Sequence, residues 1–142
     1  MTSPRLVRSS AWQHMAQHTP EDGLALPACP SCGHLFYPPQ SYCPHCLHAP
    51  VVFQADSGLA TVLSVCALHV SFDEALKAQL PMQTVQVRTD SGVCLFALAD
   101  TALATGARVT VHLLADLYGG AAVFLVRPAS EVLKGDAEDG HA

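Results

Sequence analysis

The sequence predicts a mainly β chain with an N-terminal helix, a small metal-binding module and a five- to six-stranded barrel. Three observations carry this prediction. Four cysteines form two C-x-x-C pairs, short runs rich in Val, Leu and Thr fill the second half, and turn residues separate those runs at the spacing of all-β folds. Hydrophobic residues make up 50% of the 142 residues, which is ample material for a core.

Residues 6–18 are predicted to form the leading helix. Val7, Ala11 and Met15 recur at helical spacing, with Trp12 beside them, and turn residues follow. A helix this short is marginal by itself, so we expect it to pack against the rest of the chain.

The two cysteine pairs predict a structural zinc site. Ten residues separate Cys29-Pro30-Ser31-Cys32 from Cys43-Pro44-His45-Cys46. Each C-x-x-C knuckle directs two thiolates at one point, and two knuckles complete a tetrahedral site with no open position. The predicted ligands are Cys29, Cys32, Cys43 and Cys46, in a ribbon of the rubredoxin-like type.

Other interpretations of these cysteines stay open in the sequence. The pairs could be redox motifs or disulfides, and His34, His45 or His48 could replace a ligand. Duplicated knuckles at this spacing favour zinc. Reduced thiolates in a zinc site then indicate a cytoplasmic protein.

An apolar tip, Leu35-Phe36-Tyr37-Pro38-Pro39, lies between the knuckles. Its two prolines prevent pairing as the interior of a strand. Phe36 and Tyr37 have two possible roles, packing onto the neighbouring domain or contacting a partner protein, and packing is favoured.

The second half predicts an OB-fold. Val85 and Val87 alternate with polar residues, and Val109, Val111 and Leu113 are predicted to face inward on a later strand. A short helix interrupts the strands, with Ser71 and Glu74 as its capping box. The helix is predicted between the middle strands of a small Greek-key barrel, an arrangement typical of this fold. Strands are predicted at Val51–Ala55, Leu59–Val70, Met82–Thr89, Val93–Ala99, Ala107–Ala115 and Ala121–Arg127. The predicted organisation is helix and linker at 1–26, zinc ribbon at 27–50, OB-fold at 51–129 and a disordered tail at 130–142.

No catalytic residue is predicted. Cys66 and Cys94 fall within strands and are expected in the core, and His69 and His112 are expected to be satisfied barrel histidines. The sequence contains no nucleophile elbow, P-loop or dinucleotide-binding glycine motif.

The charge pattern narrows the possible partners. The formal net charge is −5, charged residues make up only 13%, and no basic residue lies between Cys29 and Cys46. A ribbon without Lys or Arg is a poor phosphate binder, which argues against nucleic acid. Neither a membrane span nor a secretory signal is visible. A surface so poor in charge suggests that another protein covers part of it.

Together these motifs resemble the acyl-CoA-associated zinc-ribbon/OB-fold proteins catalogued as domain of unknown function 35. The resemblance spans about residues 5–129 and rests chiefly on the two knuckles and the aromatic-Pro-Pro tip. Gly58, Pro81 and Gly106 resemble the barrel landmarks of the family.

The resemblance implies a non-catalytic, zinc-binding accessory subunit of an acyl-CoA-processing enzyme. The implied partner is a thiolase-like catalytic subunit, either a thiolase or an acyltransferase of the thiolase fold; the alternative is a CoA-ester aldolase or hydratase. In such a hetero-oligomer the small subunit helps to assemble the complex and enclose the CoA ester. No residue is assigned to CoA binding.

Two hypotheses from other classes remain. Zinc ribbons and OB-folds also bind nucleic acids, although this acidic chain lacks the basic residues that such binding requires. An independent enzyme would have to use a residue such as Cys66 or His69.

Overall fold

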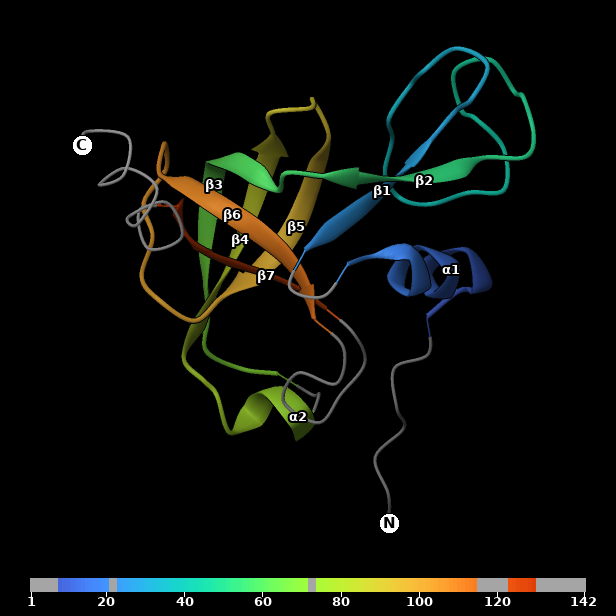
Figure 1. Ribbon diagram of the computed structural model, residues 1–142. Helices are drawn as coiled ribbons and strands as arrows, with labels where there is room; N and C mark the ends of the chain where they lie inside the picture. Colours follow the sequence, from blue (N-terminus) through green and yellow to red (C-terminus); the bar gives the residue numbers. More distant parts are fainter. Residues whose placement is uncertain (1–7, 21–22, 72–73, 115–122, 130–142) are drawn as a thin grey trace.

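The computed structural model describes residues 8–20, 23–71, 74–114 and 123–129. The fold is mainly β, as predicted, with a ribbon region beside a barrel (Figure 1). The elements in chain order are α1 (Ser10–His18), β1 (Leu24–Ala28), β2 (Val52–Asp56), β3 (Leu59–Leu68), α2 (Glu74–Lys77), β4 (Met82–Thr89), β5 (Cys94–Ala99), β6 (Arg108–Leu114) and β7 (Val123–Pro128).

Five strands form a closed barrel in the order β3-β4-β5-β7-β6. β5 and β7 are parallel, and the other neighbours in the barrel are antiparallel. Along the chain these are the first, second, third, fifth and fourth barrel strands, which is the Greek-key order of an OB-fold. The predicted fold class is therefore confirmed. The residues predicted to face inward are buried: Val85, Val87, Val109, Val111 and Leu113.

The β3–β6 closure depends on a close backbone approach at Gly58. This glycine has a φ of +76°, and a Cβ there would lie 2.6 Å from the carbonyl oxygen of Val111. The N–H of Val111 donates to the carbonyl of Gly58 at 2.8 Å. A residue without a side chain is therefore required at this barrel corner.

Two strands lie outside the barrel, and this differs from the sequence prediction. β2, predicted as part of the strand series at Val51–Ala55, pairs antiparallel with β1 in a separate two-stranded sheet. β1 itself was expected to be linker and ribbon. Its residues are apolar and all buried, so they show no alternation from which a strand could be recognised.

The helices are shorter than predicted. α1 begins at Ser10 because the Ser9 side chain caps it, accepting a hydrogen bond from the Trp12 N–H at 3.2 Å. α2 has only four residues, and it lies between the first two barrel strands rather than the middle ones. Val7 and the side chain of Glu74 lie outside the described residues, as do residues 115 and 121–122 of two predicted strands and the tail at 130–142.

The helix, the ribbon and the barrel share one apolar core. The Trp12 Nε1–H donates to the Tyr37 hydroxyl at 3.1 Å, and the rings of Trp12 and Tyr37 lie 5.6 and 5.4 Å from that of Phe124 in β7. Phe36 is buried, and the Leu113 N–H donates to the Gly23 carbonyl at 3.0 Å. Tyr37 therefore packs against the barrel, as favoured, and holds the base of the ribbon there, whereas Phe36 is buried and stacks on His34 of the ribbon.

Candidate metal centre

The structure brings the four cysteines predicted as ligands into one cluster. Their Sγ atoms all lie within 4.8 Å of one another, with 3.5 Å between Cys29 and Cys46 and 3.7 Å between Cys32 and Cys43. A Zn–S bond of about 2.3 Å separates tetrahedral sulfur pairs by about 3.8 Å. The spacing and chemistry of the donor set therefore fit a tetrahedral zinc ion.

The two knuckles repeat the same backbone hydrogen bonds. In the first, the N–H of Gly33 donates to Cys29 O and the N–H of Cys29 donates to His34 O, both at 2.9 Å. In the second, the N–H of Leu47 donates to Cys43 O and that of Cys43 donates to His48 O, again both at 2.9 Å. Each turn is set locally by its C-x-x-C sequence, and β1 and β2 bring the two turns together.

Backbone N–H groups also point at the sulfurs. The N–H groups of Cys32 and Cys46 lie 3.4 and 3.5 Å from Cys29 Sγ and Cys43 Sγ, and the His45 N–H lies 3.3 Å from Cys43 Sγ. Such donors stabilise thiolates, which are the form that binds a metal. Cys29 and Cys43 are buried, whereas Cys32 and Cys46 face solvent.

The thiols cannot all ionise without a cation. Burial raises the pKa of Cys29, but hydrogen bonds from the backbone of Cys32 and Ser31 and from neighbouring thiols outweigh it and lower this pKa to about 6. The backbone of His48 favours the Cys46 thiolate, yet burial and the neighbouring sulfurs raise its pKa to about 12. A divalent ion removes this mutual repulsion, because it holds all four groups as thiolates.

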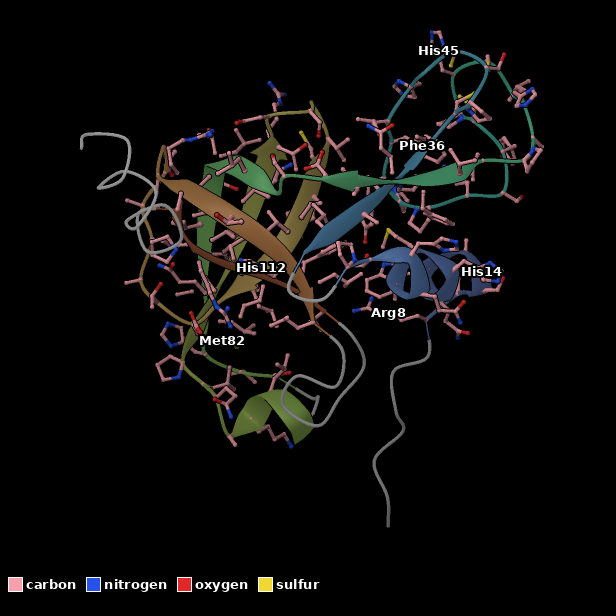
Figure 2. The ribbon with its side chains drawn as sticks, viewed as in Figure 1. Arg8, His14, Phe36, His45, Met82 and His112 are labelled. Atoms are coloured by element: carbon pink, nitrogen blue, oxygen red, sulfur yellow. The ribbon has the colours of Figure 1, made fainter. Side chains whose placement is uncertain are left out.

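The nearby histidines lie outside the cluster. His34, His45 and His48 are exposed, and the cysteines form the only group of three or more metal-binding side chains among the described residues. Figure 2 shows His45 at the end of the ribbon loops, far from the barrel.

Two predicted core thiols are exposed instead, so that prediction was wrong. Cys94 and the buried Leu95 are neighbours on β5, and neighbouring side chains of a strand point to opposite faces of the sheet. Cys94 therefore faces solvent. On β3 all five residues from Leu63 to Ala67 are exposed, so Cys66 lies on a part of the strand where the core covers neither face. The sequence of this strand is apolar on both faces and does not show where that cover ends.

The two predicted barrel histidines differ in exposure. His112 is buried on β6, as expected of a barrel histidine, whereas His69 follows the end of β3 and is exposed.

The barrel also carries an exposed ion pair. The Arg108 guanidinium donates two hydrogen bonds to the Asp90 carboxylate, each at 2.8 Å, and a third to Thr61 Oγ1 at 3.0 Å. Hydrogen bonding to Arg108 lowers the pKa of Asp90, and the same contact raises the pKa of Arg108. This arginine is thus engaged within the fold.

Within the described residues, no helix has the length and apolar character required to span a membrane.

Comparison with known proteins supports the zinc-ribbon interpretation. Residues 17–52 match the family model of the ChsH2 rubredoxin-like zinc ribbon domain. The comparison with curated proteins finds no match. The matched segment contains all four clustered cysteines, so the prediction of a structural zinc is confirmed.

Two solved structures share the fold. One is described as an Ltp2-ChsH2(DUF35) aldolase; it is 23% identical, with a TM-score of 0.67, covering 89% of this chain and 99% of that one. The other is a DUF35-family protein of unknown function from Sulfolobus solfataricus; it is 20% identical, with a TM-score of 0.56, covering 83% and 86%. Residues 17–52 therefore form a zinc ribbon similar to that of ChsH2, and the chain as a whole shares its fold with two DUF35 structures.

Proposed function

We propose that this chain is a non-catalytic accessory subunit of an acyl-CoA-processing enzyme. The observation that carries the proposal is the likeness to a chain of the structure described as an Ltp2-ChsH2(DUF35) aldolase, which extends over 89% of this chain and 99% of that one. The sequence motifs also favour a scaffold, because none of them assembles a nucleophile, a base and an oxyanion site.

Four-thiolate coordination by Cys29, Cys32, Cys43 and Cys46 is part of the proposal. Four protein ligands leave the zinc no position for water or substrate, so its role is to hold the ribbon. The ribbon base carries Tyr37, which contacts both α1 and the barrel. The metal would thereby fix a rigid surface for a catalytic subunit.

The class of the catalytic subunit is the open part of the proposal. A thiolase or a thiolase-fold acyltransferase follows from the family resemblance, whereas the name of the solved relative favours an aldolase. The chemistry separates the two. A thiolase cleaves a β-ketoacyl-CoA with free CoA into two CoA esters, whereas an aldolase cleaves a β-hydroxyacyl-CoA into a carbonyl compound and one CoA ester without consuming CoA.

The proposed contribution to the CoA ester is enclosure. A barrel beside an active site can exclude water and orient an acyl chain, which lowers a barrier without added chemistry. Arg88 is exposed on β4 and Arg127 is half-buried on β7, whereas Arg108 is engaged by Asp90. Because these residues lie on separate strands, we assign most contacts with the CoA phosphates to the catalytic subunit.

Co-purification tests the proposal. The full zinc-loaded chain, tagged and expressed at native abundance, is expected to recover a catalytic subunit in stable stoichiometry. The recovered complex is then assayed with β-ketoacyl-CoA plus CoA and, separately, with β-hydroxyacyl-CoA. Recovery of the chain as a monomer without any acyl-CoA enzyme would contradict the proposal. A salt-dependent mobility shift with nucleic acid would favour the alternative instead.

A further inference from the structure

One exposed residue of the ribbon has a backbone conformation that its side chain disfavours. Leu47 has a φ of +66° and is the only non-glycine residue with a positive φ in the described part of the chain. Residues other than Gly, Asn and Asp rarely adopt this left-handed conformation. The Leu47 side chain is also 70% exposed, so packing within the chain does not compensate for it.

The first knuckle shows what the fold alone requires at this position. Gly33 occupies the equivalent place, with a φ of +77° and the same N–H hydrogen bond to the first cysteine of its knuckle. A Cβ on Gly33 would meet nothing within 4 Å, so the glycine there answers to the backbone conformation and not to crowding. Glycine would therefore suit position 47 at least as well, and the leucine has no evident role in the fold.

The ribbon around Leu47 is free of charged side chains. Residues 23–55 contain no Asp, Glu, Lys or Arg, so all seven basic and all twelve acidic residues of the chain lie elsewhere. Tyr42 beside the second knuckle is 46% exposed. The centres of protein interfaces are depleted of charged residues and enriched in aromatic anchors, so this surface can be covered without burying a charged Asp, Glu, Lys or Arg side chain.

We propose that Leu47 is the anchor by which the zinc ribbon docks on the catalytic subunit. This inference rests on the proposed function and names the contact through which the two subunits associate. On the catalytic subunit, the corresponding site is an apolar pocket into which the Leu47 side chain inserts. Such a pocket would remove the exposed leucine side chain from water, which is favourable for an apolar group, and a few fully buried residues carry most of the affinity of an interface.

The charge of the metal centre indicates which groups should surround that pocket on the partner. A zinc ion with four thiolates has a formal charge of about −2, and Cys32 and Cys46, the latter adjacent to Leu47, face solvent. The complementary partner surface therefore has basic or N–H donor groups around its apolar pocket. Figure 2 shows His45, which directly precedes Cys46 in the second knuckle, at the end of the ribbon loops away from the barrel.

Binding measurements with the catalytic subunit recovered by the wild-type chain test this anchor. Leu47→Asn keeps a residue that tolerates a positive φ but removes the apolar side chain, so it should weaken binding at least tenfold. Leu47→Met should stay within about threefold of the wild type, because it keeps an apolar side chain of similar volume.

Val70→Asn is the matched control. Val70 is 72% exposed and precedes α2, which Figure 1 shows at the other end of the molecule from the ribbon loops. The control should bind within about twofold of the wild type. All variants should retain the zinc content of the wild type.

A stability measurement tests the argument without any partner. Leu47→Gly should leave the Tm of the zinc-loaded chain unchanged or raise it, because glycine adopts the left-handed conformation freely. A lower Tm would mean that the leucine serves the fold, and this would overturn the inference.

The remaining outcomes separate the inference from the proposed function. If the wild type binds an acyl-CoA enzyme and Leu47→Asn binds it equally well, or if Val70→Asn loses as much affinity as Leu47→Asn, the anchor is wrong and the accessory function stands. If the wild type binds no such enzyme, both proposals fall.

Discussion

At the scale of single residues, the four thiols of the metal centre differ in exposure. Cys29 and Cys43 are buried against the ribbon, whereas Cys32 and Cys46 face solvent. Cys43 also accepts two of the backbone N–H contacts that stabilise thiolates in the cluster. A change at Cys43 therefore removes a ligand and also the sulfur that the N–H groups of His45 and Cys46 contact.

We predict that Cys43→Ser abolishes zinc binding and unfolds the ribbon. A structural zinc site contributes on the order of 10 kcal/mol through coupled folding, and most of this is lost with one buried ligand. The measurements are zinc per chain by elemental analysis and the Tm. Cys66→Ser, which changes an exposed thiol outside the cluster, should keep both values. An unchanged zinc content in the Cys43 variant would refute the ligand assignment.

At the scale of elements, one aromatic junction joins three parts of the chain. Trp12 of α1, Tyr37 of the ribbon and Phe124 of β7 meet there, and the Trp12 indole donates to the Tyr37 hydroxyl. Aromatic pairs with this geometry add to the burial of their surfaces. The orientation of the ribbon relative to the barrel therefore depends on a small number of side chains.

Tyr37→Phe should destabilise the chain by about 1–3 kcal/mol, because the largely buried indole N–H loses its acceptor while the ring contacts remain. Urea denaturation monitored by tryptophan fluorescence measures the change. Tyr42→Phe removes an equivalent hydroxyl from an exposed ring and should leave the urea midpoint unchanged. Equal midpoints for the two variants would mean that the junction hydrogen bond contributes nothing.

The Arg108–Asp90 pair links β6 to the turn between β4 and β5, and it predicts a pH dependence. Since the folded-state pKa of Asp90 is depressed, its stabilising contribution is present above the unfolded value of about 3.9 and is lost as pH falls through the folded pKa. The effect is small because both side chains are half exposed to solvent.

Asp90→Asn should therefore lower the Tm slightly at pH 7, and the difference from the wild type should shrink towards zero well below pH 3.9. Asp100→Asn, which removes another exposed carboxylate, serves as the control for net charge. A difference that persists unchanged in strong acid would show that the ion pair is not its cause.

At the scale of the whole molecule, charge and structure divide the chain into two regions. The ribbon segment 23–55 has no charged side chain, and the charged residues lie in the remainder. Trp12, the only tryptophan, lies where the two regions meet and is 6% exposed. Its fluorescence therefore reports whether the ribbon stays attached to the barrel.

Removal of zinc with a chelator should shift the Trp12 emission to longer wavelength, because the unfolded ribbon no longer provides the Tyr37 contact. Acid should have the same effect, since protons compete with the metal for the thiolates. Addition of zinc at neutral pH should restore the original spectrum. Emission that stays unchanged after complete zinc removal would show that the metal does not hold this junction.

The sequence by itself determined the metal centre and most of the barrel strands. The four ligands fall within residues 29–46, and each knuckle is a local turn whose geometry follows from its spacing. Met82–Thr89 was predicted with the observed bounds, because its alternation records the one-sided burial of a barrel strand.

Only the tertiary structure decided the pairing of β1 with β2, the outward direction of Cys66 and Cys94, and the inward packing of Tyr37. β1 is buried throughout and has no alternation, whereas residues 63–67 of β3 are exposed on both faces of the strand. These features depend on contacts between residues far apart in the chain. Local spacing cannot encode them, because the same short pattern can pair in more than one register.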